Sequence, residues 1–528
     1  MDSKDVIIIG GGHNGLVCAY YLARKGLSVT VLERRHIVGG AAVTEEFHPG
    51  FRNSVASYTV SLLNPKIIRD LSLKRHGLRI VERRLSNFLP LENGYFKVGP
   101  GIVEKEIAKF STKDAERFAQ FSARTEVLAD VLRDLILKTP PNFGSKSWLA
   151  SITEAVKSLP LLNNLRKLKI ESQRDLLTLF GKSAGDILDH WFESDPIKAS
   201  WGFDAVVGTY ASPYTPGSAY VMLHHAFGEV NGKKGVWGHA IGGMGAITQA
   251  MAKACAEVGV DVRLSSPVSE VIVDPITQDA RGVVTEAGDK ILGSIVVSNL
   301  NPKLLYQKLI DPAYLPEDFK NRIVQWRCCS GTFRMNVALS ELPRFTCLPE
   351  VGDHHTSGII IGPSLAYMDR AYTDAQTFRW SLEPIIEMLI PSTLDDTLAP
   401  PGQHVASLFC QHVKPEGVDW SKYKTKVAKL MIGTVARHAP GFEKSILGMQ
   451  VLSPTDLEDM FGLVGGDIFH GNLSIDQMFS ARPVLGYGDY RSPIAGLYMC
   501  GSGTHPGGGV TGAPGHNAAR EILKDLGY

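Results

Sequence analysis

A glycine-rich segment near the start of the chain constrains the fold more than any other feature. It reads VIIIGGGHNGLVCAYYLARKGLSVTVLERR, and Gly10, Gly12 and Gly15 fit the pattern G-x-G-x-x-G. The β-branched run at residues 6–9, just before the glycines, is typical of a parallel strand that is buried on both faces. A strand, a tight glycine turn and a helix in this order predict a Rossmann-type α/β domain that binds a dinucleotide.

The residues after the glycines complete this unit. Residues 14–24 predict a helix whose N-terminal amides face the phosphates of the dinucleotide. Residues 28–32 predict a second strand, and Glu33 stands at its end, where a carboxylate accepts hydrogen bonds from ribose hydroxyls. We therefore include Glu33 in the predicted site, together with residues next to the motif: His13, Asn14 and Arg34.

The sequence ERRHIVGGAAVTEEF, which follows the second strand, bears on the choice of dinucleotide. Gly39 and Gly40 resemble the second half of the two-dinucleotide-binding motif of FAD oxidoreductases, which NAD domains lack. That motif usually has a basic residue after the glycine pair, where this chain has Ala41 and Ala42. The resemblance predicts FAD as the cofactor, with Gly39, Gly40 and Ala41 in its binding site.

Composition and charge exclude several other classes of protein. A chain of 528 residues is long enough for two or three domains, because single cores stop growing at roughly 250 to 300 residues. The 55 Lys and Arg residues balance 54 Asp and Glu residues, which argues against a nucleic-acid partner. The seven cysteines are scattered and form no C-x-x-C pair, so we expect no disulfide framework, no dithiol centre and no metal site.

The C-terminal stretch LYMCGSGTHPGGGVTGAPGHNAAREILKDLGY holds a second group of glycines. Residues 497–500 predict a short buried strand, residues 501–515 a glycine-rich loop and residues 516–526 an amphipathic helix. This stretch resembles the C-terminal flavin motif of the phytoene desaturase-like family of carotenoid and retinoid oxidoreductases. In that family the loop runs under the isoalloxazine ring of FAD. The resemblance implies cofactor contacts here for five residues: Gly501, Ser502, Gly507, Gly508 and Val510.

His505 lies inside the same loop and allows two interpretations. It could transfer a proton near the flavin, or it could simply order the loop. We take it as the candidate catalytic residue. By contrast, the adjacent His224 and His225 have no partner at metal-ligand spacing and are expected to pack or to form hydrogen bonds.

A third segment of the phytoene desaturase-like pattern lies in the middle of the chain. Residues 242–245 predict a glycine turn that leads into a helix ending near residue 258. Val268 then occupies a place at which, in that family, the valine backbone meets the adenine. The resemblance extends over nearly the whole chain and implies a substrate domain inserted into the FAD-binding domain.

The predicted organisation is a Rossmann-type FAD-binding domain of the two-dinucleotide-binding-motif type with an inserted α+β substrate domain. The FAD-binding domain is discontinuous and takes in residues 1–100, 235–300 and 480–528. Residues 101–234 are expected to form a mainly helical cap, and residues 301–479 the substrate domain. Within the cap, leucines at helical spacing with Lys157, Arg166, Lys167 and Lys169 leave two alternatives: a helix packed on its own domain, or a face that touches a membrane or a greasy substrate.

The resemblance implies an FAD-dependent oxidoreductase, of dehydrogenase, desaturase or isomerase type, that acts on a small apolar, isoprenoid or lipid-like substrate. Two alternatives stay open: a flavin-holding regulatory protein with little turnover, and an FAD amine oxidase. The residues specify neither the electron acceptor nor the oligomeric state. We expect a cytoplasmic protein, peripheral to a membrane in one alternative and in the mitochondrial matrix in another, because the first apolar run leads directly into the glycines.

Overall fold

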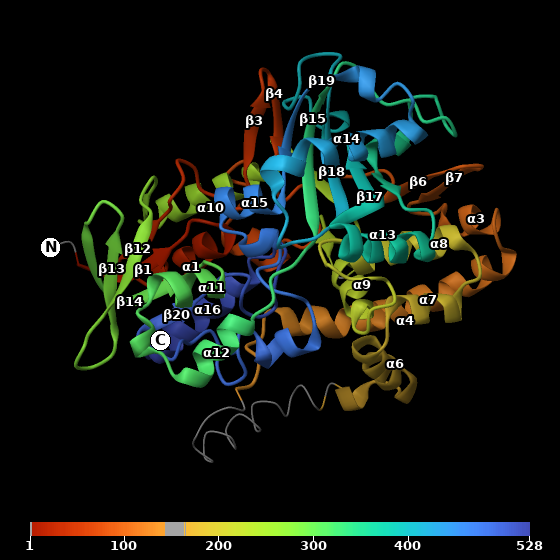
Figure 1. The fold of residues 1–528 in the computed structure, drawn as a ribbon. Helices are drawn as coiled ribbons and strands as arrows, with labels where there is room; N and C mark the ends of the chain where they lie inside the picture. Colours follow the sequence, from red (N-terminus) through yellow and green to blue (C-terminus); the bar gives the residue numbers. More distant parts are fainter. Residues whose placement is uncertain (1–2, 143–162, 164, 227) are drawn as a thin grey trace.

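The computed structural model describes residues 3–142, 163, 165–226 and 228–528. Two seven-stranded sheets form its framework, and helices cover them (Figure 1). The first sheet has the order β11-β2-β1-β14-β13-β12, with β20 paired to β14. Its strands are β1 (Ser3–Ile9), β2 (Val29–Leu32), β11 (Asp261–Arg263), β12 (Val268–Val273), β13 (Ala280–Thr285), β14 (Lys290–Ser298) and β20 (Leu497–Met499).

The first sheet joins stretches of chain that are far apart in sequence. β1 pairs in parallel with β2 on one side and with β14 on the other. Two strands pair with the edge of β14 that faces away from β1: β13 pairs with the first residues of β14, and β20 pairs with its last residues. The predicted β-strand and helix order is confirmed, and it places the carboxyl ends of β1, β2, β14 and β20 at one edge of the sheet.

The hydrophobic run of β1 is buried on both faces, as expected of a central strand. Val6 and Ile8 pack in one apolar cluster with α1 (His13–Ala23), α10 (Gly245–Glu257) and α16 (Ala513–Asp525). Ile7 and Ile9 pack in a cluster on the opposite face, which includes Phe319 of α12 (Glu317–Gln325). Alternate side chains of one strand thus form the cores of two layers.

The second sheet has the order β19-β15-β18-β17-β16-β6-β7. Its strands are β6 (Asn87–Leu91), β7 (Gly94–Val98), β15 (Thr332–Leu339), β16 (Gly358–Ile361), β17 (Trp380–Leu389), β18 (His404–Val413) and β19 (Ile446–Leu452). The helices around it are α13 (Leu365–Phe378), α14 (Trp420–His438) and α15 (Pro454–Phe461). All pairs are antiparallel except β6 with β16.

The cap region is helical in its described part and lies beside the second sheet (Figure 1). It consists of α3 (Val103–Ala108), α4 (Thr112–Ile136), α6 (Ile170–Gly181), α7 (Ala184–Trp191), α8 (Asp195–Val206) and α9 (Ser218–Ala226). Shorter elements are α2 (Pro65–Asp70), α11 (Pro302–Leu304), and the two-stranded pairs β3 (Thr44–His48) with β4 (Phe51–Ser54), β5 (Ile80–Glu82) with β10 (Gly238–Ala240), and β8 (Glu229–Val230) with β9 (Lys233–Lys234). Lys157 of the predicted amphipathic face lies outside the described residues.

Two boundaries differ from those expected from the sequence. β6 and β7 fall inside the stretch 1–100 but belong to the second sheet, because Phe88 pairs with Ile359 and is buried in the core of that sheet. The last helix begins at Ala513, three residues before the predicted start. Pro514 is tolerated there because the first turn of a helix needs no N–H from that position.

Candidate functional site

One cavity of about 470 Å³ lies between the two sheets and contains most of the predicted site. Ile9 and Leu32, the last residues of β1 and β2, line one part of it, and Glu387 of β17 lines another. A ligand at the carboxyl ends of parallel strands is the general arrangement of open α/β sheets. The cavity therefore extends from the predicted dinucleotide turn to the second sheet.

The glycine turn is close-packed in a way that excludes side chains. Gly10 has φ +95°, a conformation that favours glycine. A Cβ on Gly15 would lie 2.3 Å from the carbonyl oxygen of Gly10, and a Cβ on Gly12 would lie 2.7 Å from Nδ2 of Asn299. Two glycines thus allow the close approach of helix and turn, and the Asn299 amide fixes the turn by donating to the Gly10 carbonyl at 3.3 Å.

Glu33 anchors the turn from the end of β2. Its side chain is 5% exposed, and its two carboxylate oxygens accept hydrogen bonds from the backbone amides of Gly11 and Arg35 at 2.8 and 2.9 Å. A carboxylate offers about four lone-pair positions, so these two bonds leave acceptor capacity for further donors. Because Glu33 also lines the cavity, it is placed to accept ribose hydroxyls.

Unpaired polar atoms at the start of α1 test whether the turn suits a dinucleotide. His13 Nε2 and Asn14 Oδ1 are buried without a hydrogen-bond partner among the described residues, and both side chains line the cavity. Gly12 caps the helix and offers no side-chain bond to its first amides. Burial lowers the pKa of His13 to about 4, so this imidazole is neutral. Uncapped amides and unpaired polar groups beside a glycine turn fit a diphosphate-bearing cofactor.

Most of the predicted cofactor residues share this cavity. Twelve line it: Gly10, Gly12, His13, Asn14, Glu33, Arg34, Gly39, Gly40, Ala41, Val268, Ser502 and Val510. The other four, Gly15, Gly501, Gly507 and Gly508, are not in the lining. Gly15 and Gly501 instead permit backbone contacts at the turn, since a Cβ on Gly501 would lie 2.7 Å from the carbonyl oxygen of Asn299. A Cβ on Gly508 would collide with Phe469, which does line the cavity.

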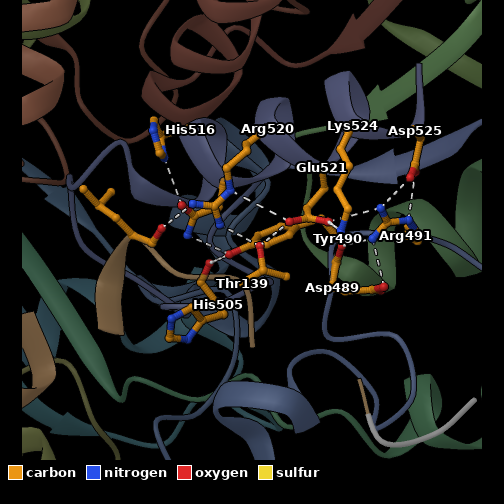
Figure 2. Close-up of polar contacts among 12 residues, drawn as sticks. Thr139, Asp489, Tyr490, Arg491, His505, His516, Arg520, Glu521, Lys524 and Asp525 are labelled. Carbon is orange, nitrogen blue, oxygen red and sulfur yellow. Dashed lines mark hydrogen bonds and ion pairs between the residues drawn. The ribbon is translucent and has the colours of Figure 1, made fainter. Parts of the chain in front are cut away.

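The C-terminal loop is held by a polar cluster around α16 (Figure 2). Tyr490 donates from its hydroxyl to the carbonyl oxygen of His505 at 2.9 Å, and it accepts from Asn517 Nδ2 at 2.9 Å. The same amide nitrogen donates to the carbonyl oxygen of Ile136 at the end of α4. These bonds tie the loop to both α4 and α16, which fixes the loop backbone next to the cavity.

His505 occupies a different place from the one expected of a catalytic residue. Its Nε2 donates to the carbonyl oxygen of Leu135 at 3.0 Å, its ring packs on Phe479, and it does not line the cavity. Burial lowers its pKa to about 4. A neutral imidazole that already donates its proton to the backbone orders the loop, so the structure favours this interpretation over proton transfer.

A second set of ionisable groups lies near the second sheet, and two of its members, Tyr58 and Glu387, line the cavity. Tyr58 donates to Glu387 Oε2 at 2.5 Å, and the Arg334 guanidinium lies 4.4 Å from the centre of the Tyr58 ring. Arg83 donates to Thr59 Oγ1 and is almost fully buried, as is Arg334. Burial raises the pKa of Glu387, against the opposing effects of the two guanidiniums and the Tyr58 hydroxyl. The cluster is thus a buried carboxylate balanced by two permanent cations.

Sequence reasoning missed several residues of the cavity. Asn299 follows β14, and the rule that parallel strands end at one edge of a sheet was the signal that could have found it. Tyr58, Asp204 and Glu387 come from a loop, from α8 and from β17, and no local pattern connects them. His225 was expected to pack or to form hydrogen bonds, which it does, and it lines the cavity as well.

The cysteines take no part in the cavity lining. All seven are free. Asn301 Nδ2 donates to Cys328 Sγ at 3.4 Å, and Cys329 Sγ donates to Asn472 Oδ1 at 3.4 Å. Burial raises the pKa of both thiols to about 12, which keeps them protonated and unreactive.

The described part of the chain offers neither a metal site nor a helix that could cross a membrane. Within it, no three His, Cys, Asp or Glu side chains gather in a way that could hold a metal ion. None of the helices described there is both long and apolar enough to span a bilayer.

Comparison with known proteins adds independent information. A family model described as flavin containing amine oxidoreductase matches residues 15–330. The chain is 40% identical to pyridine nucleotide-disulfide oxidoreductase domain-containing protein 2 of Rattus norvegicus, over 99% of this chain and 94% of that protein. It is 23% identical to the lycopene-forming phytoene desaturase of Pantoea ananas, over 99% of this chain and 100% of the desaturase.

A solved structure of wild-type putrescine oxidase bound to putrescine has a similar architecture. The TM-score is 0.60, with 17% identity, and the match covers 99% of each chain. At this identity the likeness concerns the fold. It agrees with a Rossmann-type domain joined to a second, sheet-based domain.

Proposed function

Because the chain belongs to the flavin-containing amine oxidoreductase family, we propose that it removes hydrogen from an apolar, lipid-like substrate. The predictions of FAD as cofactor and of an FAD-dependent oxidoreductase are confirmed by this family membership. The substrate class is the proposed part. It rests on the lining of the cavity beyond the glycine turn.

The observation that supports an apolar substrate is the continuity of the cavity. The space lined by the glycine turn is also lined by Leu62, Phe203, Val207, Ile468 and Phe469. Burial of a hydrocarbon against such side chains contributes roughly 25 cal/mol for each Å² of apolar surface removed from water. A substrate with a long apolar part would bind there and would need few hydrogen bonds along that part.

The protein's own groups would hold the cofactor and position it. The amides at the start of α1, with Asn14, would bind the diphosphate, and Glu33 would bind the ribose. Ser502 and Val510 line the cavity from the loop that α16 and Tyr490 support. FAD bound in this way supplies a hydride acceptor, while the protein supplies position and exclusion of water.

The proposal can be tested by reducing the purified FAD-loaded protein under anaerobic conditions. Isoprenoid and carotenoid pools, fatty lipids, polyamines and NADH are offered separately, and loss of the oxidised flavin absorbance is followed. We expect an isoprenoid or lipid pool to bleach the flavin. Bleaching by polyamines alone would identify an amine oxidase, and no bleaching by any pool would favour a regulatory flavoprotein; either result contradicts the proposal.

A further inference from the structure

Two polar side chains from neighbouring helices line the cavity without serving the dinucleotide turn. Asp204 is on α8 and His225 is on α9, and Phe203 of α8 and Val207 just after it belong to the apolar wall of the cavity. The two residues are in contact, because His225 Nδ1 lies 3.0 Å from the carbonyl oxygen of Asp204. No ion pair or hydrogen bond between their two side chains is found in the described structure.

The hydrogen bonds of His225 determine which of its ring nitrogens carries the proton. Nδ1 lies 3.0 Å from the carbonyl oxygens of both Asp204 and Val221. A carbonyl oxygen can only accept, so Nδ1 must be the donor. Burial lowers the pKa of His225 to about 4, so the ring is neutral and Nε2 keeps its lone pair. Nε2 has no bond with the described residues and offers a fixed acceptor to the cavity.

Asp204 offers the complementary group. Its carboxyl makes no hydrogen bond with the described residues, and its near neighbours in the chain, Phe203 and Val207, also line the cavity. Burial, reinforced by the charge of Glu387, raises its pKa well above the ordinary value. A protonated carboxyl is a hydrogen-bond donor. The neighbouring Glu387 is different, because it accepts a hydrogen bond from Tyr58 and lies in the field of two guanidiniums.

The cavity wall here offers one hydrogen-bond donor, the Asp204 carboxyl, and one acceptor, Nε2 of His225, and few substrate groups can pair with both. A carbonyl oxygen accepts only and would leave Nε2 of His225 unpaired. An ammonium group would need an ionised Asp204 in an apolar wall, which is costly. A hydroxyl group accepts through its oxygen and donates through its hydrogen, and so matches both residues.

We infer that Asp204 and His225 bind a hydroxyl group carried by the apolar substrate. The inference rests on the proposed function, since it takes the apolar wall as the place of the substrate chain. The Asp204 carboxyl donates to the hydroxyl oxygen, and the hydroxyl donates to Nε2 of His225. The substrate is then an alcohol with an apolar chain, and these two residues select it over the corresponding hydrocarbon.

The test measures binding by the FAD-loaded protein for three probes with one skeleton: farnesol, farnesene and farnesylamine. Equilibrium dialysis with the ligand quantified by mass spectrometry gives the affinity, and the shift of the flavin absorption band gives a second readout. We expect farnesol to bind at least about tenfold more tightly than farnesene, since the hydrocarbon leaves both polar groups unpaired.

Variants separate recognition from structural damage. Asp204→Leu and His225→Phe should each reduce farnesol affinity about tenfold while leaving farnesene affinity and FAD content unchanged. Asp204→Asn keeps a donor and should retain farnesol binding within a few-fold. The control is Asp189→Asn, an exposed carboxyl on α7 that pairs with Lys198 and does not line the cavity, which should change nothing.

Each other outcome overturns the inference in a distinguishable way. Equal affinity for farnesol and farnesene, with flavin bleaching by an apolar pool intact, would refute the hydroxyl site and leave the proposed function standing. Tightest binding of farnesylamine, lost in Asp204→Asn, would make Asp204 the partner of a cation. Failure of all three probes to bind the FAD-loaded protein would refute both the hydroxyl site and the apolar substrate.

Discussion

The two ends of the cavity are built by different means. At the turn between β1 and α1, backbone atoms and glycines form most of the surface, and Glu33 and Asn299 hold that turn from the ends of β2 and β14. Near the second sheet, single side chains from α8, α9, β17 and the loop at Tyr58 converge. The first end tolerates no added side chain, whereas the second end depends on charges that balance one another. We therefore expect substitutions at the glycine turn to reduce FAD binding, and substitutions near the second sheet to reduce the free energy of unfolding.

The largest effect is expected at the glycine turn, for Gly12→Leu. A Cβ at this position lies 2.7 Å from Asn299 Nδ2, and the remaining side chain would extend into the cavity beside Gly39 and Gly40. We expect loss of FAD from the purified protein, a decrease in affinity of at least about 100-fold, corresponding to roughly 3 kcal/mol. The flavin absorbance per protein after gel filtration measures it. Full flavin content would contradict the assignment of the turn.

Glu387→Leu should break the charge balance at the other end. It leaves Arg83 and Arg334 buried without their carboxylate, which costs about 3 to 5 kcal/mol of unfolding free energy. Denaturant unfolding followed by circular dichroism measures the loss. Asp476→Asn is the control, because the pair of Asp476 with Arg327 is exposed and its loss should cost about 0 to 1 kcal/mol. Equal losses of unfolding free energy in the two variants would mean that the buried cluster contributes no more to stability than an exposed ion pair.

His505→Ala tests the C-terminal glycine-rich loop, which lines the cavity with Ser502 and Val510. Removing the ring leaves the carbonyl of Leu135 without its donor and opens a space against Phe479. We expect a loss of about 1 to 3 kcal/mol in unfolding free energy, with FAD content retained. The pH dependence of flavin reduction should match that of the parent protein. A reduction rate that falls and loses a pH step would return His505 to a catalytic role.

Asp204→Asn should change the pH dependence of stability. Because burial raises the pKa of Asp204 in the folded state, its stabilising contribution is complete below the unfolded value, about 3.9, and is lost as pH rises through the folded value. Asparagine removes this titration. We expect the variant to gain roughly 2 °C in Tm over the parent near pH 8, with a smaller gain near pH 4. A gain that is constant across this range would show that Asp204 does not hold its proton.

The smallest effect is expected for the double change of Cys328 and Cys329 to Ser. Both thiols have a pKa raised to about 12 by burial and form weak hydrogen bonds with asparagine side chains. Flavin reduction by an active substrate should stay within about twofold of the parent, a difference of less than about 1 kcal/mol. Complete loss of turnover with FAD content and stability intact would indicate dithiol chemistry.

The contrast between the two ends also explains what could be predicted from sequence. Gly10, Glu33 and the β-branched run of β1 form a local pattern, because the strand, the turn and the acid that anchors the turn all lie within the first 33 residues. The substrate end has no such pattern. Asp204 and Glu387 approach each other only after β17 and α8 have packed, so their shared environment is a tertiary property. The two interpretations of His505 could not be separated from sequence for a related reason: its partner, the carbonyl of Leu135, is 370 residues away.

The position of β20 has a consequence for how the protein is made. β14 pairs with β1 from the first residues of the chain and with β20 from the last part of it, and the loop after β20 lines the same cavity. During synthesis, the glycine turn leaves the ribosome hundreds of residues before its counterpart. Such non-local pairing is slow to form and exposes apolar strand edges meanwhile. Flavin can therefore be captured in its complete site only after translation has reached the C-terminal helix, which makes loading one of the last steps of maturation.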